Sequence, residues 1–231
     1  MVLRLLKISC FLLICTELSW PQSVATNNHD TQLWPEIYIT KKLTERTALA
    51  GLSELHIGKD MTTPIEEQIG VGFSYSPTPF ISLVPFYRLI AGQARPDHHT
   101  QESRPQLDVV LHIPLLWRFD INDRNRCEFR WIDGQASQRY VNRMLLEHPV
   151  LVAKKRFIPF AGVEWFYDTR YDTWNRTRYS AGVHLPINSH MEVSPYFLHQ
   201  NDSRSTPGHV NAIAMIWRVG IRGKIARDER P

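Results

Sequence analysis

The sequence contains too few cysteines for a disulfide framework. It has three in 231 residues, and two of them, Cys10 and Cys15, lie in an apolar stretch at the very start. Once that stretch is removed, as proposed below, only Cys127 remains. No internal disulfide is then possible.

Long hydrophobic runs are also missing. No segment beyond residue 30 reaches the roughly 20 apolar residues that a membrane-spanning helix needs, and helical periodicity is almost absent there. Lipid offers no hydrogen bonds to the backbone, so a chain of this kind can cross a membrane only as a closed barrel.

Neither sign of charge dominates. The formal net charge is +4 at pH 7, and the basic residues are spread along the chain. No nucleic-acid partner is therefore expected, because such a partner selects a clustered basic patch. Asp97, His98 and His99 are adjacent, but no second group of ligands follows at a useful spacing. No metal site and no cofactor are expected.

The first residues have the pattern of a secretory signal peptide. Arg4 and Lys7 give a positive start, residues 8–15 are apolar, and Ser23-Val24-Ala25 supplies small residues before a cleavage point. We predict a signal peptide over residues 1–25 and one domain over residues 26–231. The alternative is a buried first helix of a soluble protein.

The remainder alternates with a period of two residues in segments of about ten, which is typical of β-strands. In the first clear case, Ile69, Val71, Phe73 and Tyr75 share one face, and glycines and serines share the other. The alternation recurs over residues 126–131, 161–167, 176–185 and 213–221. A soluble sandwich also alternates, but a polar face of Gly, Ser, Arg and Glu suits a crowded lumen.

This pattern predicts an all-β fold, a closed antiparallel transmembrane β-barrel of 10–12 strands. Eleven segments are counted, and because single-chain bacterial barrels have even numbers of strands, ten or twelve is expected. Residues 93–104 and 201–210 are polar and punctuated by proline. They are predicted to be long exposed loops.

Several motifs occur in an order that resembles a known bacterial family. They are RNRCEFRW from residue 124, SQRYVNRM from 137, PFAGVEWFYD from 159, NRTRYSAGVHL from 175 and MEVSPYFLHQND from 191, and the earlier segment with Trp34 also fits. The chain resembles, over about residues 33–221, the family catalogued as domain of unknown function 2490. The resemblance implies an outer-membrane barrel of a Gram-negative bacterium and implies no activity.

Charged residues on the polar face are predicted to form a lumen network, in which arginine pairs with carboxylates across neighbouring strands. The predicted members are Arg126, Glu128, Arg130, Arg139, Arg143, Glu164, Arg176, Arg178 and Glu192. Six arginines against three glutamates predict a positive lumen. The network either fills the lumen structurally or forms an anion-binding constriction.

The opposite face is predicted to contact lipid through aromatic side chains, as in the girdles of membrane barrels. These are Phe129, Trp131, Trp165, Tyr167, Tyr179 and Trp217. Outer-membrane lipid and the barrel-assembly machinery are the expected partners.

Three functions remain open from the sequence. The first is an outer-membrane barrel with a structural, narrow-channel or transport role and no catalytic residues. The second is a membrane-embedded lipid hydrolase or acyltransferase. Ser180 and His184 share one strand face, but they are about 13 Å apart on an extended strand, too far for a direct hydrogen bond. The third is a soluble, lipocalin-like binding barrel, which would need its aromatic face inside.

Overall fold

The computed structural model describes residues 28–95, 98–153 and 155–221, so the predicted signal peptide and its cleavage site lie outside the described residues. Every long element is a strand. The strands are β1 (His29–Lys42), β2 (Thr47–Gly58), β3 (Thr63–Thr78), β4 (Ile81–Arg95), β5 (His98–Pro114), β6 (Asp120–Ile132), β7 (Gln135–Glu147), β8 (Val150–Val152), β9 (Lys155–Asp168), β10 (Thr173–Asn188), β11 (Met191–Asp202) and β12 (His209–Ile221). A short 3-10 turn, η1 (Leu116–Arg118), connects β5 to β6. No helix in the described part is long and apolar enough to cross a membrane.

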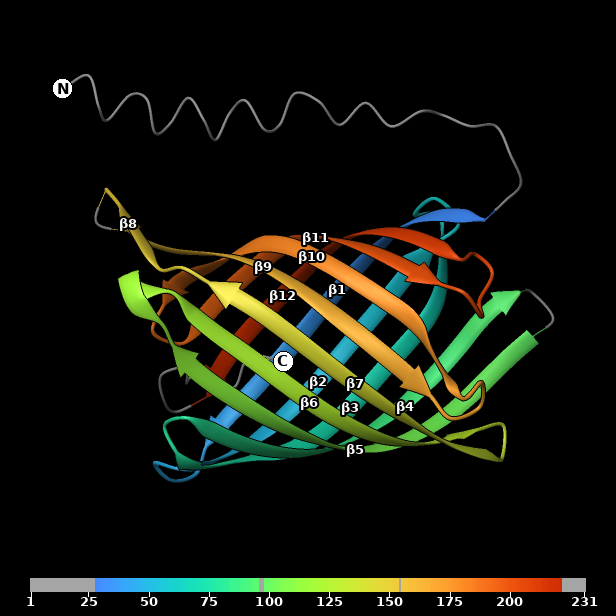
Figure 1. Ribbon diagram of the computed structural model, residues 1–231, viewed down its shortest axis with the longest axis horizontal. Coiled ribbons are helices and arrows are strands. Elements are labelled where there is room, and N and C mark those ends of the chain that lie inside the picture. The colour runs from blue at the N-terminus through green and yellow to red at the C-terminus, as the bar shows by residue number, and fades with distance from the viewer. Residues whose placement is uncertain (1–27, 96–97, 154, 222–231) are drawn as a thin grey trace, which may run out of the picture.

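Eleven strands close into a barrel, with each strand paired to the next along the chain except that β7 pairs directly with β9. The remaining strand, β8, pairs only with the start of β9 and projects beyond the barrel (Figure 1). The predicted all-β closed barrel is therefore confirmed.

The barrel is closed by a parallel pair. β1 and β12 run side by side in the same direction, from His29↔His209 to Lys41↔Ile221, whereas all other neighbours are antiparallel. An odd number of strands joined by hairpins must contain one such parallel seam. The eleven strands counted in the sequence match the eleven strands of the ring. The expectation of ten or twelve strands was wrong.

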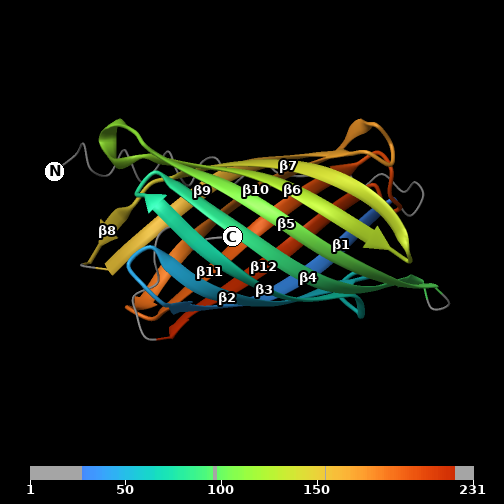
Figure 2. The same ribbon diagram turned by 90° about the horizontal axis from the view of Figure 1, so that it is seen from below.

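The direction of β1 and β12 provides names for the two ends of the barrel. We call them the His29 end, where β1 and β12 begin, and the Ile221 end, where β12 finishes. Figures 1 and 2 show the strands tilted against the long axis, with β8 projecting at the Ile221 end.

Of the two predicted long loops, which both lie at the His29 end, the first is mostly strand and the second is a shorter loop. Within residues 93–104 the chain forms the end of β4 and the start of β5, with only residues 96–97 undescribed, and within 201–210 the connection is limited to residues 203–208. Strands of 15 and 17 residues exceed the roughly 9–11 that cross a bilayer. The polar residues between 93 and 104 therefore lie mainly at the ends of these two long strands and did not indicate a long loop.

Side chains alternate between a buried interior and an exposed outer face. Phe129 and Trp131 are each 45% exposed and Tyr179 is 52% exposed, while the other predicted lipid-facing aromatics, Trp165 and Tyr167 on β9 and Trp217 on β12, are half-buried on the same outer face. Cys127 is also on that face and exposed. An apolar outer surface fits a hydrocarbon environment.

One polar cluster interrupts the outer face. On β6 and β7, Tyr140 donates a hydrogen bond to Asn125 at 2.5 Å, and Asn142 donates to Asp123 at 2.6 Å and to Asn125 at 3.2 Å. These groups satisfy one another, which lowers the cost of placing them beside lipid.

Interior glycines make room for large side chains that fill the lumen. A Cβ added to Gly72 would lie 2.0 Å from Cδ2 of Phe86, and one on Gly162 would lie 2.2 Å from Cδ2 of Leu145. In both cases the large side chain comes from a strand paired with the glycine's own strand. At these positions the large side chains lie over the glycines of the neighbouring strand and occupy part of the interior, as expected for a narrow barrel.

This packing predicts that Gly72→Val destabilises the barrel. The added side chain must displace the Phe86 ring, and overpacking of this kind costs about 1–3 kcal/mol. Chemical denaturation of the refolded protein measures the change. The double variant Gly72→Val with Phe86→Ala should recover stability relative to Gly72→Val alone, and no recovery would show that the two positions do not compete for space.

Candidate functional site

The lumen has an apolar wall and a charged wall. The apolar wall is built by inward side chains of β1, β2, β4, β11 and β12. Its members are Trp34, Tyr38, Ala50, Leu52, Phe86, Leu198, Val210, Ala212, Ala214 and Ile216. Most of the charged groups come from β5, β6, β7, β9 and β10 on the other side of the ring. The two kinds of surface therefore meet across the interior.

A cavity of about 360 Å³ lies between these walls. Ten arginines and six glutamates line it, and none of the lysines that the structure describes does. They are Arg88, Arg104, Arg124, Arg126, Arg130, Arg139, Arg143, Arg176, Arg178 and Arg218, with Glu36, Glu54, Glu66, Glu102, Glu128 and Glu164. Arginine suits this setting because its planar fork binds carboxylates through two parallel hydrogen bonds.

Two bidentate pairs anchor the charged wall. Arg126 donates to both oxygens of Asp108 at 2.8 Å. Arg130 donates to both oxygens of Glu102 at 2.7 and 2.9 Å and also to Asp168 at 2.9 Å. Both pairs join the neighbouring strands β5 and β6, and the bond from Arg130 to Asp168 also links β6 to β9, which is not its direct neighbour.

Glu128 lies at the centre of the network and is 2% exposed. Its Oε2 accepts a hydrogen bond from Nε of Arg139 at 2.7 Å. Nε of Arg104 and Nη1 of Arg126 each lie 3.8 Å from its carboxylate oxygens. One buried carboxylate thus lies within 4 Å of three arginines on three strands.

A second carboxylate, Glu164 on β9, is shared in the same way. Its Oε1 accepts a hydrogen bond from Nη2 of Arg124 at 2.5 Å, and its Oε2 lies 3.6 Å from Nη1 of Arg178. Arg143 pairs with Glu164 in the strand register. Nevertheless, Nε and Nη2 of Arg143 are buried and find no hydrogen-bond partner in the described part of the chain. This wall therefore holds one more guanidinium than its carboxylates satisfy.

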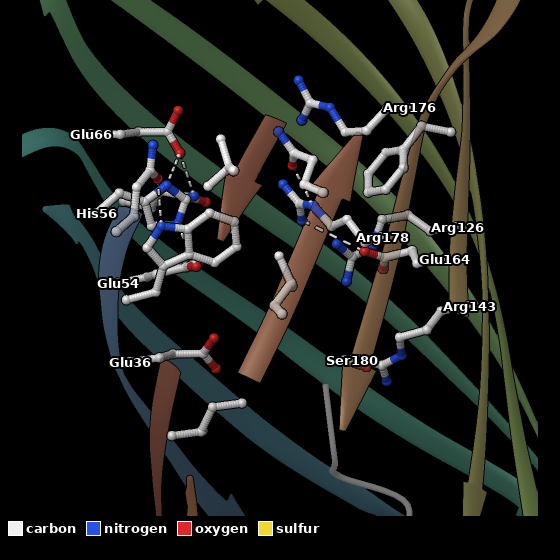
Figure 3. Close-up of a pocket in the computed structure, with 18 of the residues that line it drawn as sticks. Glu36, Glu54, His56, Glu66, Arg126, Arg143, Glu164, Arg176, Arg178 and Ser180 are labelled. Carbon is white, nitrogen blue, oxygen red and sulfur yellow. Dashed lines mark hydrogen bonds and ion pairs between the residues drawn. The ribbon is translucent and has the colours of Figure 1, made fainter. Parts of the chain in front are cut away.

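The opposite side has the reverse imbalance. Glu36 on β1 and Glu54 on β2 are register partners. Glu54 bonds to His56 at 2.8 Å and lies 3.6 Å from Arg88. Glu36 is 9% exposed, and its Oε1 is buried with no hydrogen-bond partner among the described residues. Figure 3 shows Glu36 across the cavity from Arg143, with Ser180 beside Arg143.

All nine residues of the predicted network lie on interior strand faces. Eight of them line the cavity. The ninth, Glu192, accepts a hydrogen bond from the cavity-lining Arg218 at 2.9 Å.

Sequence reasoning missed many of the partners, including Glu36, Glu54, Glu102, Asp108, Glu147, Asp168 and Asp202, and the arginines 88, 104, 124 and 218. With these carboxylates included, the interior charges nearly balance. The expectation of a positive lumen was therefore wrong. The alternation of side chains along a strand was the available signal. Each missed residue lies an even number of positions from inward-facing residues on its own strand.

A serine, a histidine and a glutamate meet near the Ile221 end. Ser194 Oγ lies 2.8 Å from Nδ1 of His184, and Nε2 of His184 lies 3.3 Å from Glu147. The serine is Ser194 on β11 and not Ser180. Its Oγ accepts a hydrogen bond from Arg218 at 2.7 Å, and its exposed fraction is 0%. Such an arrangement places the Ser194 hydroxyl beside one base, His184, and its buried contacts mainly link β7, β10, β11 and β12.

Among the described residues no group of three or more His, Cys, Asp or Glu side chains is arranged to hold a metal ion. The arginine-rich cavity instead offers fixed hydrogen-bond donors on one side and a carboxylate on the other. These groups can bind and orient a charged solute without a metal.

Comparison with solved structures finds barrels of low sequence identity. LpxR from Salmonella typhimurium is 10% identical, with 75% of this chain and 83% of that chain covered and a TM-score of 0.47. The β domain of the Bordetella autotransporter BrkA is 12% identical, with coverages of 76% and 82% and a TM-score of 0.47. A KdgM porin in complex with disordered oligogalacturonate is 13% identical, with coverages of 72% and 82% and a TM-score of 0.42.

No curated protein matches the sequence. The model of one protein family, described as a protein of unknown function (DUF2490), matches residues 31–211. That match spans more than half of the chain, from β1 into β12. The chain therefore belongs to the DUF2490 family of proteins of unknown function.

Proposed function

We propose that this barrel is a narrow transport component of the outer membrane that binds a small charged solute inside its lumen and catalyses no reaction. The observation that carries the proposal is the cavity of about 360 Å³ lined by charged side chains, among them Glu36 and Arg143, which have buried polar atoms without hydrogen-bond partners in the described part of the chain. This volume falls within the range of small-molecule sites.

Side chains obstruct the lumen, so a steady flow of ions or solute through it is not expected. Arg178 lies over the rings of both Trp34 and Phe166, with its guanidinium carbon 5.0 and 4.9 Å from the two ring centroids. Trp34 belongs to the apolar wall and Phe166 to the charged side, so the arginine bridges the two. Passage of a solute requires this bridge to move, which makes the barrel a binding or gated component rather than an open pore.

The distribution of polarity supports a membrane protein over a soluble binding barrel. A soluble barrel of the lipocalin kind keeps its apolar side chains inside and its charges in water. Here Val71 is 66% exposed and Ile69 is 58% exposed, whereas Arg218 is 2% exposed. We propose that lipid covers the outer face after insertion by the barrel-assembly machinery.

Planar-bilayer recording tests the proposal. The purified protein, reconstituted in lipid, should show little steady conductance because the paired side chains and the Arg178 bridge obstruct the lumen. The variant Arg178→Ala removes the bridge and should open at least transient conductance. A large and stable conductance in the unmodified protein would make it an open pore and would contradict the proposal.

A further inference from the structure

Glu36 and Arg143 carry opposite charges, line the same cavity and make no hydrogen bond or ion pair among the described residues. Glu36 comes from β1 and Arg143 from β7, on opposite sides of the ring (Figure 3). We propose that they are the two ends of a site for a small zwitterion, with its anionic group on Arg143 and its ammonium group on Glu36. This inference rests on the proposed solute-binding function and names its substrate class.

The contacts around Glu164 identify Arg143 as the group that would bind the anionic end of the ligand. Both of its oxygens are engaged, Oε1 by Arg124 at 2.5 Å and Oε2 near Arg178 at 3.6 Å. Arg143 makes no hydrogen bond to Glu164, and its Nε and Nη2 are buried without partners among the described residues. Buried donors of this kind are rare in folded proteins and call for a partner. A carboxylate accepts from both atoms of a guanidinium fork.

The cation end follows from the carboxylates on the other side. Glu54 already has His56 at 2.8 Å and Arg88 at 3.6 Å. Arg88 in turn donates to Gln68 at 3.1 Å. Glu36 therefore remains the extra carboxylate on this side, and it is buried. An unpaired buried carboxylate is costly. A ligand with an ammonium group would offset the negative charge of Glu36.

The cavity between Glu36 and Arg143 indicates the chemistry of the linker that joins the two charged groups of the ligand. Trp34, Phe160, Phe166 and Tyr196 contribute ring surface to the cavity lining, so a short hydrocarbon linker is favoured between the charged groups. The ring of paired strands is continuous, and no lipid headgroup can enter from the side. The ligand is therefore a soluble amino carboxylate rather than a membrane lipid.

The proposed site also predicts how substitutions change the melting temperature of the protein without ligand. Removing one of two unpaired buried charges relieves a desolvation cost. Glu36→Gln and Arg143→Gln should therefore each melt at a temperature equal to or above that of the unmodified protein. A residue that served only the fold would lower the melting temperature when replaced.

Binding is tested on the full-length processed barrel in detergent, through the ligand-induced rise in melting temperature. The probes are the amino acids glycine, β-alanine, γ-aminobutyrate and ε-aminocaproate, which separate the two charges by increasing lengths. Hexanoate and hexylamine are the singly charged controls for ε-aminocaproate. We expect one zwitterion length to bind best and to exceed both controls. Loss of either charged contact should weaken it by roughly 10- to 100-fold, as charge-assisted hydrogen bonds imply.

The two variants assign the ends. Glu36→Gln should weaken binding of the best zwitterion and leave hexanoate unchanged, and Arg143→Gln should weaken the zwitterion and leave hexylamine unchanged. If hexanoate or hexylamine binds as tightly as every zwitterion, the inference fails while solute binding in the lumen stands. If no probe raises the melting temperature and both variants are less stable, the inference and the proposed function both fail.

Discussion

Glu128→Ala is expected to destabilise the barrel by about 3–5 kcal/mol, the cost of leaving a buried partner charge uncompensated. The carboxylate is 2% exposed. It accepts a hydrogen bond from Arg139 at 2.7 Å, and Arg104 and Arg126 each lie 3.8 Å away. Removing it leaves the buried Arg139 without its hydrogen-bonded carboxylate, whereas Arg104 keeps Glu102 and Arg126 keeps Asp108. Urea unfolding of the protein in detergent or lipid measures the loss.

An exposed ion pair provides the matched control. Lys42 and Glu45 lie 2.8 Å apart in the β1–β2 turn, and the Glu45 side chain is 92% exposed. Solvent screens such a pair, so Glu45→Ala should leave stability unchanged within error. The double variant Glu128→Leu with Arg139→Leu should recover part of the loss, because an apolar pair replaces a broken charged one. Equal stability of Glu128→Ala and Glu45→Ala would mean that the lumen is wet enough to screen its charges.

Tyr179→Arg is expected to impair membrane insertion and to cost about 2–4 kcal/mol, the value for an arginine on the lipid face near the middle of the bilayer. Tyr179 lies near the midpoint of β10 and is 52% exposed on the outer face. Its neighbour Arg178 faces the lumen. The cost therefore arises from the direction of the side chain and not from the presence of arginine at this depth.

Trp174 supplies the control on the same strand and face. It is 57% exposed and lies near the His29 end of β10, where an arginine reaches water. Trp174→Arg should therefore cost only about 0–1 kcal/mol. Heat-modifiable gel migration and urea titration of reconstituted protein compare the two. Equal effects would place the centre of the bilayer elsewhere along the strands.

The direction of most side chains was predictable from the sequence because a strand has a period of two. Once Phe129 and Trp131 are assigned to lipid, Glu128 and Arg130 must face the lumen, since a shift of one residue would exchange the faces. The apolar wall was harder to foresee. On β12 both Ile213 and Ala214 are apolar although they face opposite sides, so alternation there carries little information.

The partners within the lumen could not be predicted in the same way. Arg130 and Asp168 are 38 residues apart in sequence, yet they lie 2.9 Å apart in the network. Their meeting depends on the register of two successive hairpins and on closure of the whole ring. The parallel seam depends on the same closure, because it involves the first and last strands, and no local signal specifies the direction in which they meet.

The parallel seam also limits how the barrel can be re-engineered. In a barrel with an even number of strands, the two ends of the chain emerge together, and a short linker can join them in a circular permutant. Here the start of β1 and the end of β12 are separated by the length of a 13-residue strand, about 40 Å along the strand at roughly 3.3 Å per residue. A linker would have to run through the lumen or across the lipid face. Reporter domains fused at these two points would instead lie in different compartments, so a pair of fusions would determine the orientation of the barrel in the membrane.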